Sequence, residues 1–112
     1  MLNTPEAPAH LRPETALWWR SVLADYELEE HHLRLLHLAC EAWDRGQQAR
    51  ERLDRDGLTI PTGDGGLKAH PCVAIERDAR IGFARLVREL DLDAGAPSES
   101  RRPPALASNR RL

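Results

Sequence analysis

The sequence predicts a mainly α-helical protein, with three helices at about residues 13–26, 29–56 and 71–90. Prolines mark two of the helix starts, because Pro13 and Pro71 fit the first helical position, where a missing N–H costs nothing. A glycine marks one helix end, since Gly57 is suited to the residue that follows the last turn. Between these markers the apolar residues recur with the 3.6-residue repeat of an α-helix. These three observations define the expected fold.

The first helix follows a segment without apolar periodicity. Residues 1–12 are rich in proline and alanine, which predicts a flexible, extended arm. The helix that begins at Pro13 has Glu14 in its first turn, where a carboxylate suits the helix dipole. It carries Trp18 and Trp19, and we expect it to pack on the long second helix. Alternatively, one of these tryptophans contacts a neighbouring subunit, because aromatic residues are enriched at the centres of interfaces.

The second predicted helix has two apolar stripes. One contains Leu33, Leu36, Cys40, Trp43 and Gln47. The other contains Leu35, Ala39, Ala42, Gly46, Ala49 and Leu53. A surface helix of a monomer normally buries a single stripe. The sequence therefore predicts that this helix is covered on two sides, and the second covering partner could be another copy of the chain.

The segment at 58–69 predicts a small β-hairpin or a loop of that shape. Leu-Thr-Ile is β-prone, and Asp64-Gly65 is a turn signal. Pro61 cannot donate to a strand ladder, so any strand there lies at an edge. The glycines of this segment lack the strand, spacing and Gly-Lys-Ser/Thr sequence of a phosphate-binding P-loop. We therefore do not expect nucleotide binding here.

The third predicted helix separates apolar residues from arginines. Its apolar face contains Cys72, Ile75, Ala79, Gly82, Phe83, Leu86 and Leu90. The opposite side, over roughly 140° of the circumference, carries Arg77, Arg80, Arg85 and Arg88. This side is either an ordinary solvated face or the lining of a groove or pore. Residues 93–112 form a basic tail rich in proline, serine and arginine, expected to be flexible, and Arg101 and Arg102 give it charge for phosphates or an acidic surface.

Composition bounds the function. A chain of 112 residues forms one small domain, here residues 13–92, with an arm and a tail. Its net charge of −2 hides a gradient from an acidic first third to a basic tail. There is no nucleophile elbow and no apolar run long enough to span a bilayer. The two cysteines do not predict a disulfide framework, and they fit free thiols in a reducing compartment. Histidines His31, His32 and His37 near Cys40, with His70 near Cys72, have poor zinc-site spacing. We expect no catalytic site, metal or cofactor.

The order of these signals resembles the small subunit of tailed-phage terminases. A tryptophan-bearing helix is followed by a long helix with Ala-Cys-Glu-Ala-Trp-Asp, then by Asp-Gly-Leu and a glycine-rich segment. An X-Pro pair then opens a helix that ends in Arg-Glu-Leu-Asp-Leu. The resemblance is to the short type without an obvious N-terminal helix-turn-helix, and it covers about residues 11–104. The family typically has Asn-Pro where this chain has His70-Pro71. The family also commonly continues Leu-Gly-Leu-Thr-Pro-Ser, where this chain has an insertion before Ala96-Pro97-Ser98.

The resemblance implies a non-enzymatic DNA-packaging factor in the host cytoplasm. Such proteins form rings, here expected at about eight to ten copies, bind double-stranded viral DNA and recruit or regulate the large subunit, which holds the ATPase and nuclease. The candidate DNA-binding residues are Lys68, Arg77, Arg80, Arg85, Arg88, Arg101 and Arg102. The candidate interface residues between subunits are Trp18, Trp19, Ala39, Ala42, Trp43, Gly46 and Ala49.

Two alternatives remain from the sequence. One is a small helical regulator that binds DNA as a dimer, although the connection from Gly57 to His70 is long for the tight turn of a helix-turn-helix. The other is a protein–protein adaptor without DNA contact, whose outer arginines would all be paired with acids.

Overall fold

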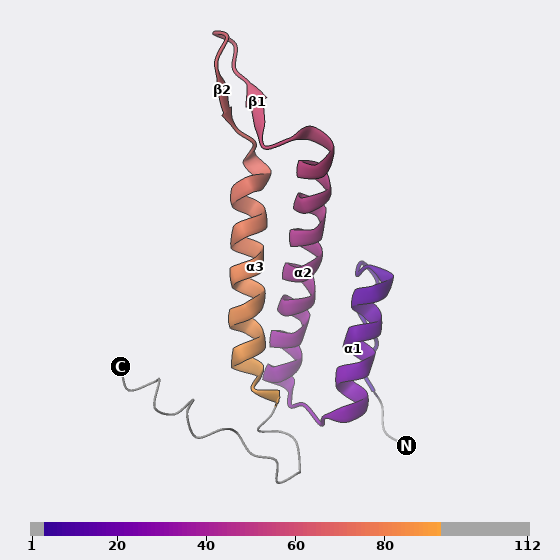
Figure 1. Cartoon of the computed structure of the whole chain (residues 1–112). Coiled ribbons are helices and arrows are strands. Elements are labelled where there is room, and N and C mark those ends of the chain that lie inside the picture. Colours follow the sequence, from indigo (N-terminus) through magenta and orange to yellow (C-terminus); the bar gives the residue numbers. More distant parts are fainter. Residues whose placement is uncertain (1–3, 93–112) are drawn as a thin grey trace, which may run out of the picture.

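Three helices and one β-hairpin make up residues 4–92, the part of the chain that the computed structural model describes (Figure 1). The helices are α1 (Pro13–Asp25), α2 (Glu30–Asp56) and α3 (Pro71–Leu90). The strands β1 (Thr59–Pro61) and β2 (Leu67–Ala69) form the hairpin between α2 and α3. The predicted fold class is therefore confirmed, and each helix end lies within one residue of its predicted position. The predicted tail at 93–112 lies outside the described residues.

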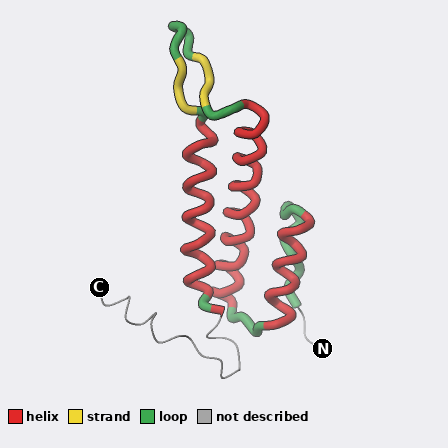
Figure 2. The backbone as a smooth tube through the Cα atoms, in the orientation of Figure 1, coloured by secondary structure: helices red, strands yellow, loops and turns green. Residues whose placement is uncertain are grey.

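Helix α2 is the central element, and at 1.5 Å per residue its 27 residues span about 40 Å. Helix α3 runs alongside it over most of this length, while α1 packs on the other side of its first half (Figures 1 and 2). Helices of the same chain thus cover parts of both apolar stripes, although Trp43 of the first stripe remains 45% exposed. The covering elements are helices of the same chain, and contact of α2 with a second copy of the chain stays a prediction.

Small residues let α2 and α3 approach closely. A Cβ atom placed on Gly46 would lie 3.3 Å from the Cβ of Ala79 on α3, and Ala39 and Ala49 on the same stripe are 0% and 2% exposed. Glycine costs helix stability because its backbone is freer in the unfolded chain. Its presence in the middle of α2 is explained by this helix contact.

The core lies where α1, the first half of α2 and the end of α3 meet. Its buried members are Leu11, Trp19, Val22, Leu36, Cys40 and Leu90. Ile75, which the periodicity places on the apolar face of α3, is instead 41% exposed. Glu76, whose carboxylate is paired with Arg80, is less exposed than Ile75.

A buried carboxylate of α2 caps the start of α1. Asp44 is 8% exposed and accepts hydrogen bonds from the Arg12 backbone N–H at 2.9 Å and the Thr15 hydroxyl at 2.6 Å. No side chain of α1 itself caps this end. Because helix N-termini carry unpaired N–H groups and a positive partial charge, Asp44 stabilises α1 while attaching it to α2.

The segment before α1 is non-helical, as predicted, but it is not a free arm. Leu11 is buried in the core, and the Pro5 carbonyl accepts a hydrogen bond from Trp19 Nε1 at 3.1 Å. Arg12 forms a two-bond ion pair with Glu51 of α2 at 2.8 and 2.9 Å. Residues 4–12 are therefore packed against α1 and α2, while residues 1–3 of the predicted arm lie outside the described residues.

His70 connects the end of α2 to the start of α3. Its Nδ1 accepts a hydrogen bond from the Cys72 backbone N–H at 3.0 Å, which makes it the N-cap of α3. With Nδ1 accepting, the ring hydrogen is on Nε2, which donates to Asp56 Oδ2 at 3.0 Å. An asparagine could provide the first of these interactions but is too short to combine both in this way. The longer side chain of His70 thus caps α3 and also reaches the end of α2.

The hairpin extends beyond the helical pair (Figure 1). Its strands are antiparallel, with the register Thr59↔Ala69, Ile60↔Lys68 and Pro61↔Leu67. Gly65 has a φ of +91°, a conformation that favours glycine and fits the predicted turn. Among the described residues, no helix is long and apolar enough to cross a membrane.

The helix contact at Gly46 predicts opposite effects of two alanine substitutions. Gly82→Ala should raise the free energy of unfolding by up to about 1 kcal/mol, since nothing lies within 4 Å of its new Cβ and alanine favours helix. Gly46→Ala should gain less or lose stability, and Gly46→Leu should lose about 1–3 kcal/mol through overpacking against Ala79. Urea unfolding measures all three. Equal gains at Gly46 and Gly82 would contradict the close approach.

The His70–Asp56 contact predicts an acid-dependent loss of stability. The hydrogen bond from His70 is the main cause that lowers the pKa of Asp56 below its ordinary value of 3.8. Burial opposes this effect, and the charges of Arg55 and Arg52 lower the pKa further. A lowered carboxylate pKa stabilises the fold above the unfolded-state pKa, and this contribution is lost as the pH falls through the folded-state value.

Urea unfolding of the wild type and Asp56→Asn across acidic pH tests this prediction. The wild type should be the more stable protein above about pH 4, and the difference should disappear as the pH falls further. Asp54→Asn, which removes the neighbouring partner of Arg50, is the matched control and should not reproduce this pH dependence. A difference between wild type and Asp56→Asn that is constant with pH would contradict the assignment.

Candidate functional site

The outer side of α3 carries a basic face, which we define as Arg77, Arg80, Arg85 and Arg88. All four are exposed, as the sequence predicted. Arg77 contacts Asp78 at 3.1 Å, and Arg80 contacts both carboxylate oxygens of Glu76 at 3.1 and 3.2 Å. Among residues 4–92, Arg85 and Arg88 form no ion pair. The half of the basic face near the end of α3 therefore has the uncompensated charge.

The other basic candidates lie outside this face. Lys68 is exposed on β2, opposite Ile60 in the hairpin, so it lies beyond the N-terminal end of α3 (Figure 2). Arg101 and Arg102 lie outside the described residues. The structure therefore groups four of the seven candidates on one helix face and places Lys68 past its end.

An aromatic groove joins the three helices on another side of the molecule. We define it by Trp18 of α1, Trp43 of α2 and Phe83 of α3, with Glu14 and Thr15 completing its lining. The Phe83 ring centroid lies 5.0 Å from that of Trp43 and 5.8 Å from that of Trp18, within the range of aromatic pairs. Trp43 remains 45% exposed. The sequence did not identify Phe83 as part of this site, because its periodicity indicates only a core position.

The candidate interface residues separate into two groups. Trp19, Ala39 and Ala49 are buried inside the single chain, and Gly46 is used in the contact with Ala79. These four positions are therefore used in contacts within the chain. Trp18, Ala42 and Trp43 are only partly covered. They are the members of the set that retain surface for a partner.

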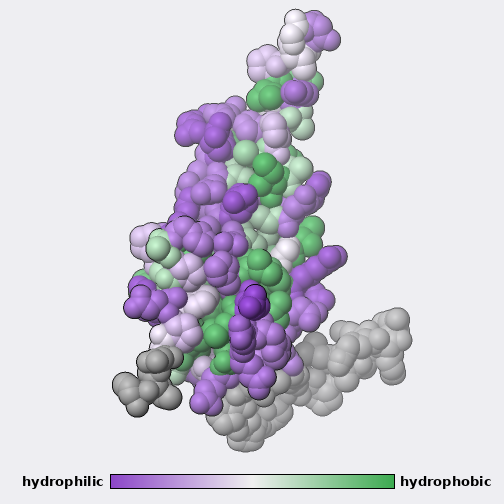
Figure 3. Space-filling model, turned by 180° about the vertical axis from the view of Figure 1, so that it is seen from behind, coloured by the Kyte–Doolittle hydropathy of each residue, from purple (hydrophilic) through white to green (hydrophobic). Residues whose placement is uncertain are grey.

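Apolar side chains also reach the surface elsewhere. Figure 3 shows apolar residues along the rear of the molecule, bordered by hydrophilic ones. Within residues 4–92, the large exposed apolar side chains are Leu17, Leu38, Trp43, Leu58, Leu67, Ile75 and Ile81. Leu58 and Leu67 belong to the hairpin region, and Ile81 lies among the arginines of the basic face. Contiguous exposed apolar surface is typical of interaction sites.

The histidines and cysteines considered for zinc are not brought together. Cys40 is fully buried in the core, where burial is the main cause that raises the pKa of its thiol to about 12, with Asp44 and Glu41 adding to it. His70 is occupied by its contacts with Cys72 and Asp56. A thiol in this environment is an inert core residue rather than a ligand.

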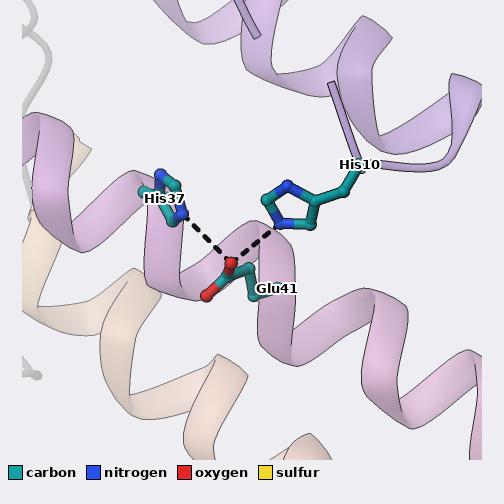
Figure 4. Close-up of side chains that lie close together, drawn as sticks. All are labelled: His10, His37 and Glu41. Atoms are coloured by element: carbon teal, nitrogen blue, oxygen red, sulfur yellow. Dashed lines mark hydrogen bonds and ion pairs between the residues drawn. The ribbon is translucent and has the colours of Figure 1, made fainter. Parts of the chain in front are cut away.

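A different cluster forms between α2 and the segment before α1 (Figure 4). His10 Nε2 and His37 Nε2 lie 2.8 and 3.1 Å from the same oxygen of Glu41, Oε2. Burial alone would raise the pKa of Glu41, but the hydrogen bonds from the two histidines outweigh it and lower that pKa. The i, i+4 spacing of His37 and Glu41 is visible in the sequence. The contribution of His10, from a segment without periodicity, is not.

The comparisons with known proteins identify the family. A family model described as phage terminase, small subunit, matches residues 18–105. Searches of curated proteins and of solved structures found no significant match. The matched range includes most of α1 and all of α2, the hairpin and α3. Proteins of this family are generally the non-catalytic component that acts in phage DNA packaging with the large terminase subunit. The chain therefore belongs to the family of phage terminase small subunits.

Proposed function

We propose that this chain is a non-catalytic packaging factor that forms a ring, binds viral DNA and recruits or regulates the large terminase subunit in the host cytoplasm. We assign it to the short type, with a glycine-rich segment and an X-Pro pair before the last helix. The family match supports the packaging role. The observation that carries the DNA contact is the basic face of α3, with Arg85 and Arg88 exposed.

The geometry of the basic face suits a phosphate backbone. Its arginines lie along about 16 Å of helix, from Arg77 to Arg88, at 1.5 Å per residue. Arginine presents a planar fork of donors that matches phosphate oxygens. Such contacts provide affinity without sequence specificity. We propose that this face, rather than the chain as a whole with its net charge of −2, determines the interaction with DNA.

The aromatic groove is the proposed contact between neighbouring subunits. Trp18, Trp43 and Phe83 form a rigid apolar surface at the junction of three helices, and partly exposed tryptophans are common at the energetic centres of interfaces. A ring needs a second, different surface on each subunit, because its contacts are head-to-tail. The exposed apolar residues outside the groove offer such a surface.

The alternative functions are less well supported. A helix-turn-helix regulator requires a tight turn before its recognition helix, whereas a β-hairpin lies between α2 and α3. A pure adaptor would leave no uncompensated arginines on its outer face. Among the described residues, Arg85 and Arg88 form no ion pair, which favours DNA contact over the adaptor.

Removing two arginines tests the DNA contact. The double variant Arg85→Ala/Arg88→Ala should bind double-stranded DNA more weakly than the wild type. The slope of log K against log salt concentration should become shallower by about 2, since each phosphate contact contributes about 0.9. Fluorescence anisotropy with a labelled duplex at several salt concentrations measures both quantities.

The matched control for this experiment is Arg34→Ala/Arg50→Ala. These two exposed arginines of α2 are paired with Glu30 and Asp54, and their removal should change the slope little. An unchanged slope in the Arg85/Arg88 variant, with binding intact, would contradict the proposed role of α3.

The mass of the protein in solution tests the ring. Native mass spectrometry of the wild type should give a closed assembly of about eight to ten copies. Trp43→Ala should shift the distribution toward small species, because it removes the most exposed ring of the groove. Arg20→Ala, which truncates an exposed polar side chain of α1 outside both proposed contact surfaces, is the control and should keep the assembly. A monomeric wild type at micromolar concentration would contradict the ring proposal.

A further inference from the structure

We propose that His10, His37 and Glu41 form a binding site for a divalent transition-metal ion, with Zn²⁺ as the best fit, that fastens residues 4–12 to α2. The family assignment does not lead to this site, and the argument does not depend on the proposed DNA or ring contacts. It rests on the convergence of three metal-ligating side chains from two separate segments (Figure 4).

The ligand atoms are already close to a metal-binding arrangement. One atom from each residue lies within 4.8 Å of the other two. In a tetrahedral site with Zn–N and Zn–O bonds of about 2.0–2.1 Å, neighbouring ligand atoms are about 3.3–3.4 Å apart. The distances of 2.8 and 3.1 Å from the two Nε2 atoms to Glu41 Oε2 need only a small increase to reach this value.

The chemistry of the ligands suits zinc. Two imidazoles and one carboxylate are a known protein ligand set for Zn²⁺ that leaves the fourth position for water or another ligand. Both imidazoles present Nε2 when their hydrogens are on Nδ1, so no backbone change is required. Imidazole ligands favour Zn²⁺, Cu²⁺ and Ni²⁺ over Mg²⁺ or Ca²⁺, which prefer oxygen.

The surroundings allow an ion to enter and to be retained. The side chains of His10, Glu41 and His37 are 58%, 41% and 41% exposed, so the site is open to solvent. The closest arginine of the same segment, Arg12, is already paired with Glu51. Asp44 and Arg45, which carry opposite charges, line the same shallow pocket.

The segments that carry the ligands define what the ion would do. His37 and Glu41 are one turn apart on α2 and are held rigidly by the helix. His10 belongs to the non-helical segment whose other anchors are Leu11, Arg12 and the Pro5 carbonyl. A bound ion would therefore add a strong cross-link between this segment and α2, and would stabilise the folded state in proportion to its occupancy.

Calorimetric titration of Zn²⁺ into the full chain tests the site at about pH 7.5, where ordinary histidines are neutral. One ion should bind per chain, and the thermal unfolding temperature should rise with Zn²⁺ concentration. His10→Ala and Glu41→Gln should each weaken the binding by at least about tenfold. Circular dichroism without metal should show that His10→Ala and Glu41→Gln both keep the helical fold.

The matched control is His31→Ala, which removes an exposed histidine of α2 outside the cluster. It should bind Zn²⁺ like the wild type. Amide hydrogen exchange of residues 4–12 should slow on addition of Zn²⁺ in the wild type and in His31→Ala, but not in His10→Ala.

Three outcomes would overturn the proposal. The first is a wild type that does not bind Zn²⁺, and the second is equal binding by the wild type and His10→Ala. The third is a sulfur-to-metal charge-transfer band when Co²⁺ replaces Zn²⁺, because it would place Cys40 or Cys72 among the ligands.

Discussion

The attachment of α1 to α2 depends on one buried carboxylate. Asp44 accepts hydrogen bonds from the Arg12 backbone and the Thr15 hydroxyl, and hydrogen bonds to a charged group contribute about 1.5–3 kcal/mol. A buried carboxylate is costly unless it is paired in this way. The position of α1 then determines where the segment before it runs, and so where His10 and Trp18 lie. The core cluster around Trp19 and Leu36, the aromatic groove and the histidine cluster each include a residue of α1 or of the segment before it.

The sequence predicted the local features of the fold well, because helix ends and apolar periodicity are local signals. Pro13, Pro71 and Gly57 mark their helix ends, and the arginines of α3 face outward as their spacing requires. Features that depend on distant contacts were missed. The partner of the Gly46 stripe is Ala79 of the same chain, and periodicity within α2 has no information about which helix covers it. His10 meets Glu41 across 31 positions of sequence, so spacing rules could not connect them.

This chain is slightly acidic overall, but the pairing of its arginines with acids differs between α2 and α3. On α2, three arginines pair with acids one turn away, in Arg34–Glu30, Arg50–Asp54 and Arg52–Asp56. Such exposed pairs contribute little to stability, but they compensate the charge of these three arginines of the central helix. On α3 the pairing extends only through Arg80 among the four arginines of the basic face. Net charge is therefore a poor guide to the partner of this protein, whereas the distribution of unpaired charge along one helix is informative.

Contacts of His70 close the base of the hairpin and join α2 to α3. The His70 backbone N–H donates to the Leu58 carbonyl at 2.8 Å, and the His70 side chain holds both Asp56 and the first turn of α3. The two helices are thus joined below the strands, independently of what lies between residues 59 and 69. Insertions, deletions or a grafted peptide in the hairpin can then alter its length without moving either helix. The hairpin is in this sense an exchangeable module on a fixed helical frame, where sequence divergence among homologous chains can accumulate at little structural cost.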